Sequence, residues 1–215
     1  MQIAFPNPEQ VGENALARFA KKPFDDFKEN LEFSSIDGIL EEILGRLGCL
    51  RRNQRIVDVG SPVEGVEIPN SIKLMRDHDM VVLNVNRIGD NTQEIEKEFR
   101  NLTVTTNVFD EPLDDILEKH GIPKEFSLLN IDSSTVETTR RPYVVSVVIN
   151  PSTHPSLDFE DGFKKTMEFW KDKGYTCITM VEKYVIFVRD DLVKQLNIKG
   201  VFLRNPELCF DWKYV

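Results

Sequence analysis

The side chains best suited to chemistry lie in a stretch that changes character within a few residues. The β-branched run at residues 55–59 contains Asp58 and leads at once into Gly60, Pro62 and Gly65. This pattern predicts a buried strand that ends in a loop whose glycines let the backbone approach a ligand closely. In open α/β sheets, ligands lie across the carboxyl ends of the strands, where an acidic residue can orient a nucleotide-type ligand. The alternative is that both glycines are ordinary turn residues and that Asp58 caps its own turn.

The elements that must position this loop alternate between strand and helix patterns. Apolar and β-branched runs predict strands at residues 55–59, 80–86, 102–108, 126–132, 143–149, 175–180 and 184–188. Helical spacing of apolar residues predicts helices at residues 36–47, 71–76, 92–100, 113–120 and 160–173. The alternation favours a mostly parallel sheet with right-handed crossovers, and the last two strands form an antiparallel hairpin. We therefore predict an α/β protein with a Rossmann-like, seven-stranded, mostly parallel sheet and a C-terminal antiparallel hairpin.

One α/β domain accounts for most of the 215 residues. It is predicted to span residues 51–196, with an N-terminal arm and helix at residues 1–50 packed on it and a tail at residues 197–215. The segment between the fourth and fifth strands, residues 133–142, leaves room for little more than a turn or two of helix.

Composition argues against several classes of function. The formal net charge of -9 disfavours general attraction to nucleic acid or to an anionic membrane. No apolar leader and no stretch of membrane-spanning length is present, which predicts a cytoplasmic protein that does not use a membrane. The cysteines are odd in number and far apart, which indicates reduced thiols: Cys49, Cys177 and Cys209. No metal site is predicted, because none of the histidines has Cys, Asp or Glu at ligand spacing: His78, His120 and His154.

Four local sequences carry a resemblance to a known family. They are the strand ending Asp-x-Gly at residues 56–60, the Leu-Asp-Asp helix with its Gly-Ile-Pro stop at residues 113–123, the strand Leu-Leu-Asn-Ile-Asp at residues 128–132, and the apolar strand at residues 141–150. In this order they resemble the S-adenosylmethionine-dependent methyltransferases of the FkbM-like group, as does the segment at residues 162–193. The resemblance covers residues 50–196 and implies a class I methyltransferase fold.

The resemblance also implies where the cofactor S-adenosylmethionine lies, over the ends of the first, second and fourth strands. Asp58 and Gly60 would shape the pocket beneath its amino acid part, and Gly65 would be the later glycine of the loop. In the family, a carboxylate at the end of the second strand takes the ribose hydroxyls. The residue here is Asn86, which can accept only through its amide oxygen. Asp110, after the third strand, is the candidate for the adenine edge.

Asp132, at the end of the fourth strand, is the candidate on the substrate side of that pocket. As a catalytic base it would take the proton of a hydroxyl substrate, because methyl transfer needs an aligned nucleophile and sometimes a base. The simpler alternative is that Asp132 caps the following turn through the backbone amides of Ser134 or Thr135. Both interpretations remain open.

Departures from the family pattern concentrate at the ligand edge. The loop after the first strand contains Pro62 and is longer before Gly65, and the family's Ile-Glu-Gly-Ala-Glu is replaced by the sequence at residues 133–137. Two functions therefore remain: an O-methyltransferase acting on a small molecule or sugar, or a catalytically inactive protein of methyltransferase fold that binds or interacts through its surface. A dinucleotide oxidoreductase is excluded, because the loop lacks G-x-G-x-x-G.

Overall fold

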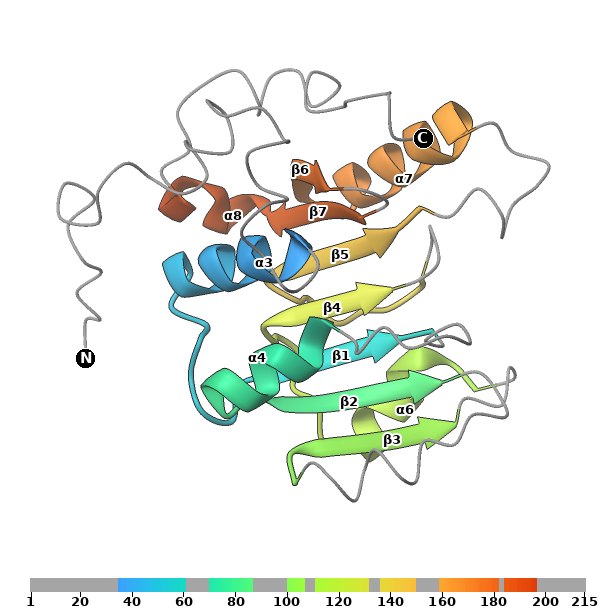
Figure 1. Cartoon of the computed structure of the whole chain (residues 1–215). Helices are drawn as coiled ribbons and strands as arrows, with labels where there is room; N and C mark the ends of the chain where they lie inside the picture. The colour runs from blue at the N-terminus through green and yellow to red at the C-terminus, as the bar shows by residue number, and fades with distance from the viewer. Residues whose placement is uncertain are drawn as a thin grey trace, which may run out of the picture.

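A computed structural model of the chain describes residues 35–60, 70–86, 100–106, 111–131, 136–149, 159–181 and 184–196. Within these ranges, seven strands form one sheet: β1 (Arg55–Val59), β2 (Val81–Asn86), β3 (Leu102–Thr106), β4 (Leu128–Ile131), β5 (Val144–Val148), β6 (Tyr175–Val181) and β7 (Tyr184–Arg189). Their order across the sheet is β3-β2-β1-β4-β5-β7-β6 (Figure 1).

The directions of the strands confirm the predicted fold class. β1 pairs in parallel with β2 and β4, and the outer neighbours β3 and β5 continue the parallel sheet. β7 pairs antiparallel with both β5 and β6. The hairpin was predicted from the sequence, but its orientation was not: the last strand lies beside β5, and β6 forms the edge.

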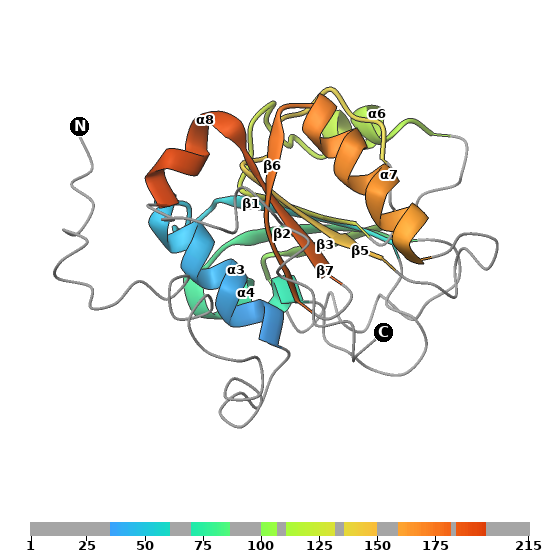
Figure 2. The ribbon, with the colours of Figure 1, turned by 90° about the horizontal axis from the view of Figure 1, so that it is seen from above.

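Helices cover both faces of the sheet, as Figure 2 shows from above. α3 (Ser35–Arg46) and α4 (Asn70–His78) lie on one face, and α6 (Leu113–Lys119) and α7 (Phe159–Asp172) lie on the other. α8 (Asp190–Val193) and the 3-10 helix η1 (Lys194–Leu196) follow β7 and pack with the α3/α4 face. In the described residues the apolar core accordingly forms two clusters, one on each side of the sheet.

Successive residues of the central strands supply these two clusters in turn. In β1, Ile56 belongs to the α3/α4 cluster and Val57 to the α6/α7 cluster, and both side chains are fully buried. This follows from the period of two in a strand, which sends neighbouring side chains to opposite faces. In a parallel sheet covered on both faces, the sequence of each central strand is therefore a nearly continuous apolar run.

α4 is longer than the helix predicted at residues 71–76 and continues to His78. Its last turn carries Arg76 and His78, and cationic groups are favourable at a helix C-terminus. Glu41 of α3 joins the two helices, because its carboxylate oxygens lie 2.9 Å from His78 Nε2 and 3.4 Å from Lys73 Nζ. These contacts hold α4 against α3.

The connection from β4 to β5 has no helix in its described part, residues 136–143; its length allows little more than a turn or two. Asp114 of α6 holds it in place: it accepts hydrogen bonds from the Thr138 hydroxyl and, at 2.9 Å, from the Thr139 backbone N–H. Burial by itself would raise the pKa of Asp114, but these hydrogen bonds outweigh burial and hold the pKa below its ordinary value.

Several predicted segments lie outside the described residues. They are the N-terminal arm up to residue 34, the loop at residues 61–69, nearly all of the helix predicted at residues 92–100, and the tail from residue 197. Among the residues that are described, no helix is long and apolar enough to cross a membrane.

Candidate functional site

The candidate site is built around Asp58, which lies one residue before the end of β1. Its side chain is 6% exposed and shares the α3/α4 face of the sheet with Ile56. Ser71, in the first turn of α4, donates its hydroxyl hydrogen to Asp58 Oδ2, and Asn130 Nδ2 of β4 donates to Asp58 Oδ1 at 2.7 Å. One helix and two strands therefore fix the carboxylate.

Asp58 belongs to a row of polar side chains that crosses four neighbouring strands. Strand register places Asn84 of β2 and Asn130 of β4 on either side of Asp58, and Ser146 of β5 beside Asn130. Asn84 is 6% exposed and Ser146 is 1% exposed. We call Asn84, Asp58, Asn130 and Ser146 the polar row. It faces α3 and α4, and it lies in the carboxyl halves of β2, β1 and β4 and at the middle of β5.

Three atoms of the polar row have no hydrogen-bond partner among the described residues. They are Asn84 Oδ1, Asn130 Oδ1 and Ser146 Oγ, and all three are buried. Buried polar atoms are nearly always hydrogen-bonded in folded proteins, and an unpartnered one points to a ligand or an ordered water. The two amide oxygens are acceptors, so they suit a group that carries N–H or O–H donors.

Burial raises the pKa of Asp58 from its ordinary value of 3.8 to about 6, against the opposing effect of the hydrogen bonds from Ser71 and Asn130. The carboxyl group therefore titrates just below neutral pH. At pH 7 it is a carboxylate held away from water, where it attracts a cation or a hydrogen-bond donor more strongly than it would at the surface.

Gly60 follows β1 directly and begins the loop. Its φ of 116° lies in a region that residues with a side chain rarely adopt, so the position requires glycine. The Gly60 N–H donates to Val85 O at 3.0 Å, which ties the start of the loop to β2. The chain leaves β1 for β2 on one side and later returns to β4 on the other, and ligands of open α/β sheets bind at such a switch point.

The structure brings together two of the predicted site residues, Asp58 and Gly60. Asn86 is the last residue of β2, two positions after Asn84; the structure describes its backbone but not its side chain. Gly65, Asp110 and Asp132 also lie outside the described residues. The roles assigned to these four residues therefore stay predictions.

The other three residues of the polar row, Asn84, Asn130 and Ser146, were not predicted from the sequence as parts of a site. Asn130 and Ser146 are each the single polar residue of an otherwise apolar strand, and Asn84 lies between apolar residues of β2; those were the available signals. Among the described residues, no group of three or more His, Cys, Asp or Glu side chains is placed to hold a metal ion.

Among known proteins, this chain is similar to solved structures in fold and not in sequence. No family model matches the chain, and no curated protein matches its sequence. Among solved structures, the chain superposes on MycE methyltransferase from the mycinamycin biosynthetic pathway, in complex with Mg and S-adenosylhomocysteine, with a TM-score of 0.50 and 11% identity over 83% of this chain and 55% of that one.

Two further solved structures are similar. The CurJ carbon methyltransferase has a TM-score of 0.45 and 11% identity over 71% of this chain and 52% of that one. A TehB-like SAM-dependent methyltransferase from Corynebacterium glutamicum has a TM-score of 0.42 and 11% identity over 85% of this chain and its whole length. The chain thus spans about half the length of MycE and of CurJ. Together with the strand order, the match to MycE identifies the fold as that of class I methyltransferases.

Proposed function

We propose that this chain binds S-adenosylmethionine at the carboxyl edge of β1, β2 and β4 and acts as a methyltransferase. The observation that carries the proposal is the buried carboxylate of Asp58 at the switch point of the sheet, flanked by the unpartnered amide oxygens of Asn84 and Asn130. Burying a charge and two unpartnered acceptors is costly for a fold, and a bound ligand would offset that cost.

The residues present fit this cofactor. S-adenosylmethionine carries an ammonium group, an exocyclic amine and ribose hydroxyls, all of which are hydrogen-bond donors, and the polar row offers acceptors. Asp58 would hold the cationic end, and Gly60 would let the backbone approach it. When bound, the cofactor supplies a methyl group activated by the sulfonium, so the protein's work is to bind and to align the acceptor.

The finer parts of the proposal rest on the sequence. The four motifs support membership of the FkbM-like group and an O-methyl transfer to a small molecule or sugar. Asp132 would be the base, and Gly65, Asn86 and Asp110 would complete the cofactor pocket. The net charge of -9 and the sequence pattern support a cytoplasmic protein whose partner is a small molecule rather than nucleic acid.

The test is a pair of ligand titrations followed by thermal unfolding, with S-adenosylmethionine and S-adenosylhomocysteine. Ligand at about one hundred times its dissociation constant stabilises a fold by about 2.7 kcal/mol, a rise in Tm of several degrees. We expect this rise in the wild type and its loss in Asp58→Asn, which keeps the size of the side chain but removes its charge. The matched control is Asp172→Asn, the same change at an exposed position of α7.

No rise in Tm with either ligand, in a protein that unfolds cooperatively, would overturn the proposal. A rise in Tm that is retained in Asp58→Asn would remove Asp58 from the site, and a rise that is lost equally in Asp172→Asn would show that the loss is not specific to Asp58. A further assay, transfer of a labelled methyl group to a panel of sugars and small hydroxyl compounds, separates a working enzyme from an inactive protein of the same fold, which would bind the cofactor without turnover.

A further inference from the structure

A pocket with a volume of about 320 Å³ lies at the edge of the sheet opposite the candidate site. Its lining comes from the segments that precede three neighbouring strands: Arg52 and Asn53 before β1, Met75 and Asp79 before β2, and Arg100 and Asn101 before β3. Parallel strands bring these segments to one edge, the amino edge. β1 has five residues, so at about 3.3 Å per residue the pocket lies a whole strand length from the candidate cofactor site.

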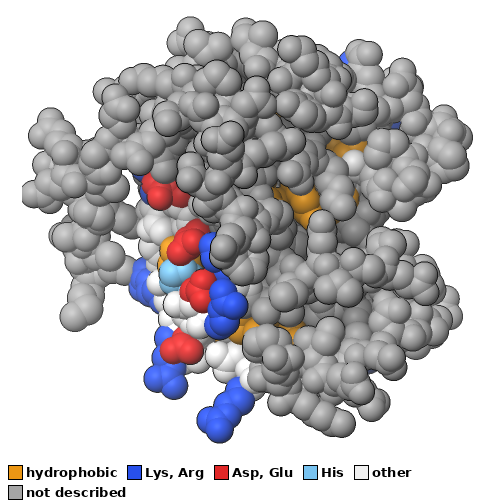
Figure 3. All heavy atoms as spheres, in the orientation of Figure 1, with side chains coloured by type: hydrophobic (Ala, Val, Ile, Leu, Met, Phe, Trp, Pro, Cys, Tyr) orange, Lys and Arg blue, Asp and Glu red, His pale blue; other side chains and the backbone are white. Residues whose placement is uncertain are grey.

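Figure 3 shows Lys and Arg side chains, with Asp and Glu between them, at the lower left of the view, over α4 and the nearby strand ends. Arg52 and Arg100 are both exposed and have no ion-pair or hydrogen-bond partner in the described part of the chain. Arg76 also lines the pocket, but its Nε pairs with Asp77 Oδ1 at 2.9 Å. Two free guanidinium groups thus border one pocket in a chain whose net charge is -9.

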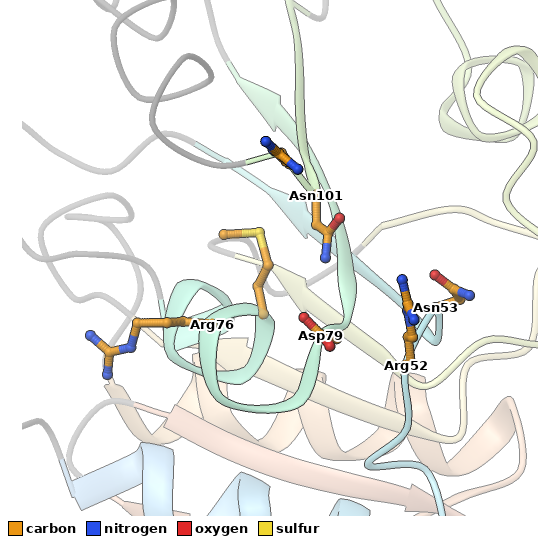
Figure 4. A pocket seen from close by; sticks show the side chains of 7 residues that line it. Arg52, Asn53, Arg76, Asp79 and Asn101 are labelled. Atoms are coloured by element: carbon orange, nitrogen blue, oxygen red, sulfur yellow. The ribbon is translucent and has the colours of Figure 1, made fainter.

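Figure 4 shows how these side chains lie. The Arg76 side chain extends away from Asp79, whereas Arg52 and Asn53 lie together on the other side of Asp79. Asn101 comes from the segment above. Met75 is the apolar residue of the described lining, and it is 3% exposed. Among the described lining residues, Asp79 is the one acid.

Backbone hydrogen bonds between the three segments fix the rim. The Asn53 N–H donates to Asp79 O at 3.0 Å, and the Val82 N–H donates to Asn101 O at 2.9 Å. Asn53 and Asp79 have φ values of 66° and 53°, in the left-handed region that Asn and Asp adopt more readily than other residues with a side chain. The pocket is therefore preorganised by the backbone.

We propose that this pocket binds a small phosphorylated molecule through its phosphate group. Guanidinium groups present paired N–H donors that match phosphate oxygens, and the Asn53 and Asn101 amides add neutral donors. The volume of about 320 Å³ leaves room for an organic part attached to the phosphate, which Met75 would contact. The proposal goes beyond the proposed function and is independent of it, because S-adenosylmethionine carries no phosphate.

Asp79 provides an internal test of the charge of the ligand. Its carboxylate repels a phosphate, so Asp79→Asn should tighten binding several-fold. Asparagine also adopts the left-handed conformation of this position, which keeps the backbone unchanged. A cationic ligand would instead bind more weakly to this variant.

The experiment is isothermal titration calorimetry on the full chain with inorganic phosphate, glycerol 3-phosphate and glycerol. We expect glycerol 3-phosphate to bind at one site, inorganic phosphate to bind more weakly there, and glycerol not to bind. The double variant Arg52→Gln/Arg100→Gln should weaken glycerol 3-phosphate at least tenfold. The charge-matched control is Lys165→Gln/Lys171→Gln, two exposed residues of α7 on the other side of the sheet, which should change binding less than twofold.

Absence of binding by both phosphate probes at about 10 mM would overturn the proposal, since that range detects even millimolar affinity. Equal losses in the arginine and lysine variants would also overturn it, because they would show general charge attraction. Thermal unfolding of each variant reports whether it is folded. Titration of the arginine variant with S-adenosylmethionine keeps the two sites separate: that binding should not change, whichever way the phosphate result falls.

Discussion

The two faces of the central strands differ at a single row of residues. On the α6/α7 face, Val57 lies beside Leu83 and Leu129, and all three side chains are apolar and buried. On the α3/α4 face, the row formed by Ile56 and its neighbours is equally apolar. One step nearer the carboxyl edge, that second face turns polar with Asp58 and the rest of the polar row.

The fold gives up stability on the α3/α4 face. Unpartnered buried atoms are costly, and three lie on the α3/α4 face, whereas the α6/α7 face has one in the described residues, Trp170 Nε1. Two of the three, Asn84 Oδ1 and Asn130 Oδ1, flank Asp58 toward the carboxyl ends of the strands, where ligands of this kind of sheet bind. We therefore interpret the apolar face as structural and the polar row as kept for a ligand.

Placing a polar side chain on the apolar face should lower the free energy of unfolding more than any other change considered. Leu129 neighbours Asn130 in β4 and is fully buried, so Leu129→Asn leaves a buried amide without partners and removes packing. We expect a loss of about 3–5 kcal/mol in the free energy of unfolding, measured by urea denaturation. Leu129→Met, which conserves volume, should cost less than about 1.5 kcal/mol. A loss below about 1 kcal/mol for Leu129→Asn would mean that the two faces do not differ as described.

The next effect is a pH dependence that belongs to Asp58. Its pKa is raised by burial from 3.8 to about 6 in the folded protein, so its contribution to stability is fully present below about pH 4 and is lost as pH rises through 6. At about 1.4 kcal/mol per pKa unit, the loss is on the order of 3 kcal/mol. The free energy of unfolding of the wild type, minus that of Asp58→Asn, should fall by this amount between pH 4 and 7.

The subtraction matters because other acids titrate in the opposite sense. Hydrogen bonding to Arg189 lowers the pKa of Asp191, and hydrogen bonding to Arg76 lowers that of Asp77, so both contribute stability that is lost on acidification. Those contributions cancel between wild type and Asp58→Asn. A difference that is flat from pH 4 to 7 would show that Asp58 is not buried as described.

Sequence reasoning found the scaffold because its signals are local. Apolar runs and helical spacing are written along the chain, and they gave the strands and the layers of this fold. Some of the motifs are structural as well: Asp114 of the Leu-Asp-Asp helix holds the β4–β5 connection. Arg189 lies in the segment at residues 162–193 that also resembles the family. Its side chain donates to Glu125 at 2.8 Å and to Asp191 at 2.7 Å, which ties β7 to the segment before β4.

The site could be predicted only in part, because its other members are neighbours in space and not in sequence. Asp58 and Gly60 follow from one stretch, but the polar row depends on the register of four strands. A shift of one residue in β4 would send Asn130 to the opposite face. The pocket at the amino edge likewise needs three separate segments to meet, as the hydrogen bonds from Asn53 to Asp79 and from Val82 to Asn101 show.

A smaller effect separates the glycine that begins the site loop from a glycine in the scaffold. Gly60 has a φ of 116°, so Gly60→Ala should lose about 1–3 kcal/mol in the free energy of unfolding and weaken cofactor binding. Gly38 lies in α3, and a Cβ there would meet nothing within 4 Å, so Gly38→Ala should gain about 0.5–1 kcal/mol. Thermal unfolding of the two variants should therefore show Tm shifts of opposite sign.

The smallest effect compares two buried serines that differ in their partners. Ser146 of the polar row has an unpartnered hydroxyl and is 1% exposed, so Ser146→Ala should raise the free energy of unfolding by about 1 kcal/mol. Ser127 is fully buried but donates to Gln54 Oε1 at 3.0 Å, so Ser127→Ala should lower it by about the same amount. Urea denaturation measures both. If Ser146→Ala destabilises instead, its hydroxyl is satisfied in solution, and ordered water rather than a ligand would complete the polar row.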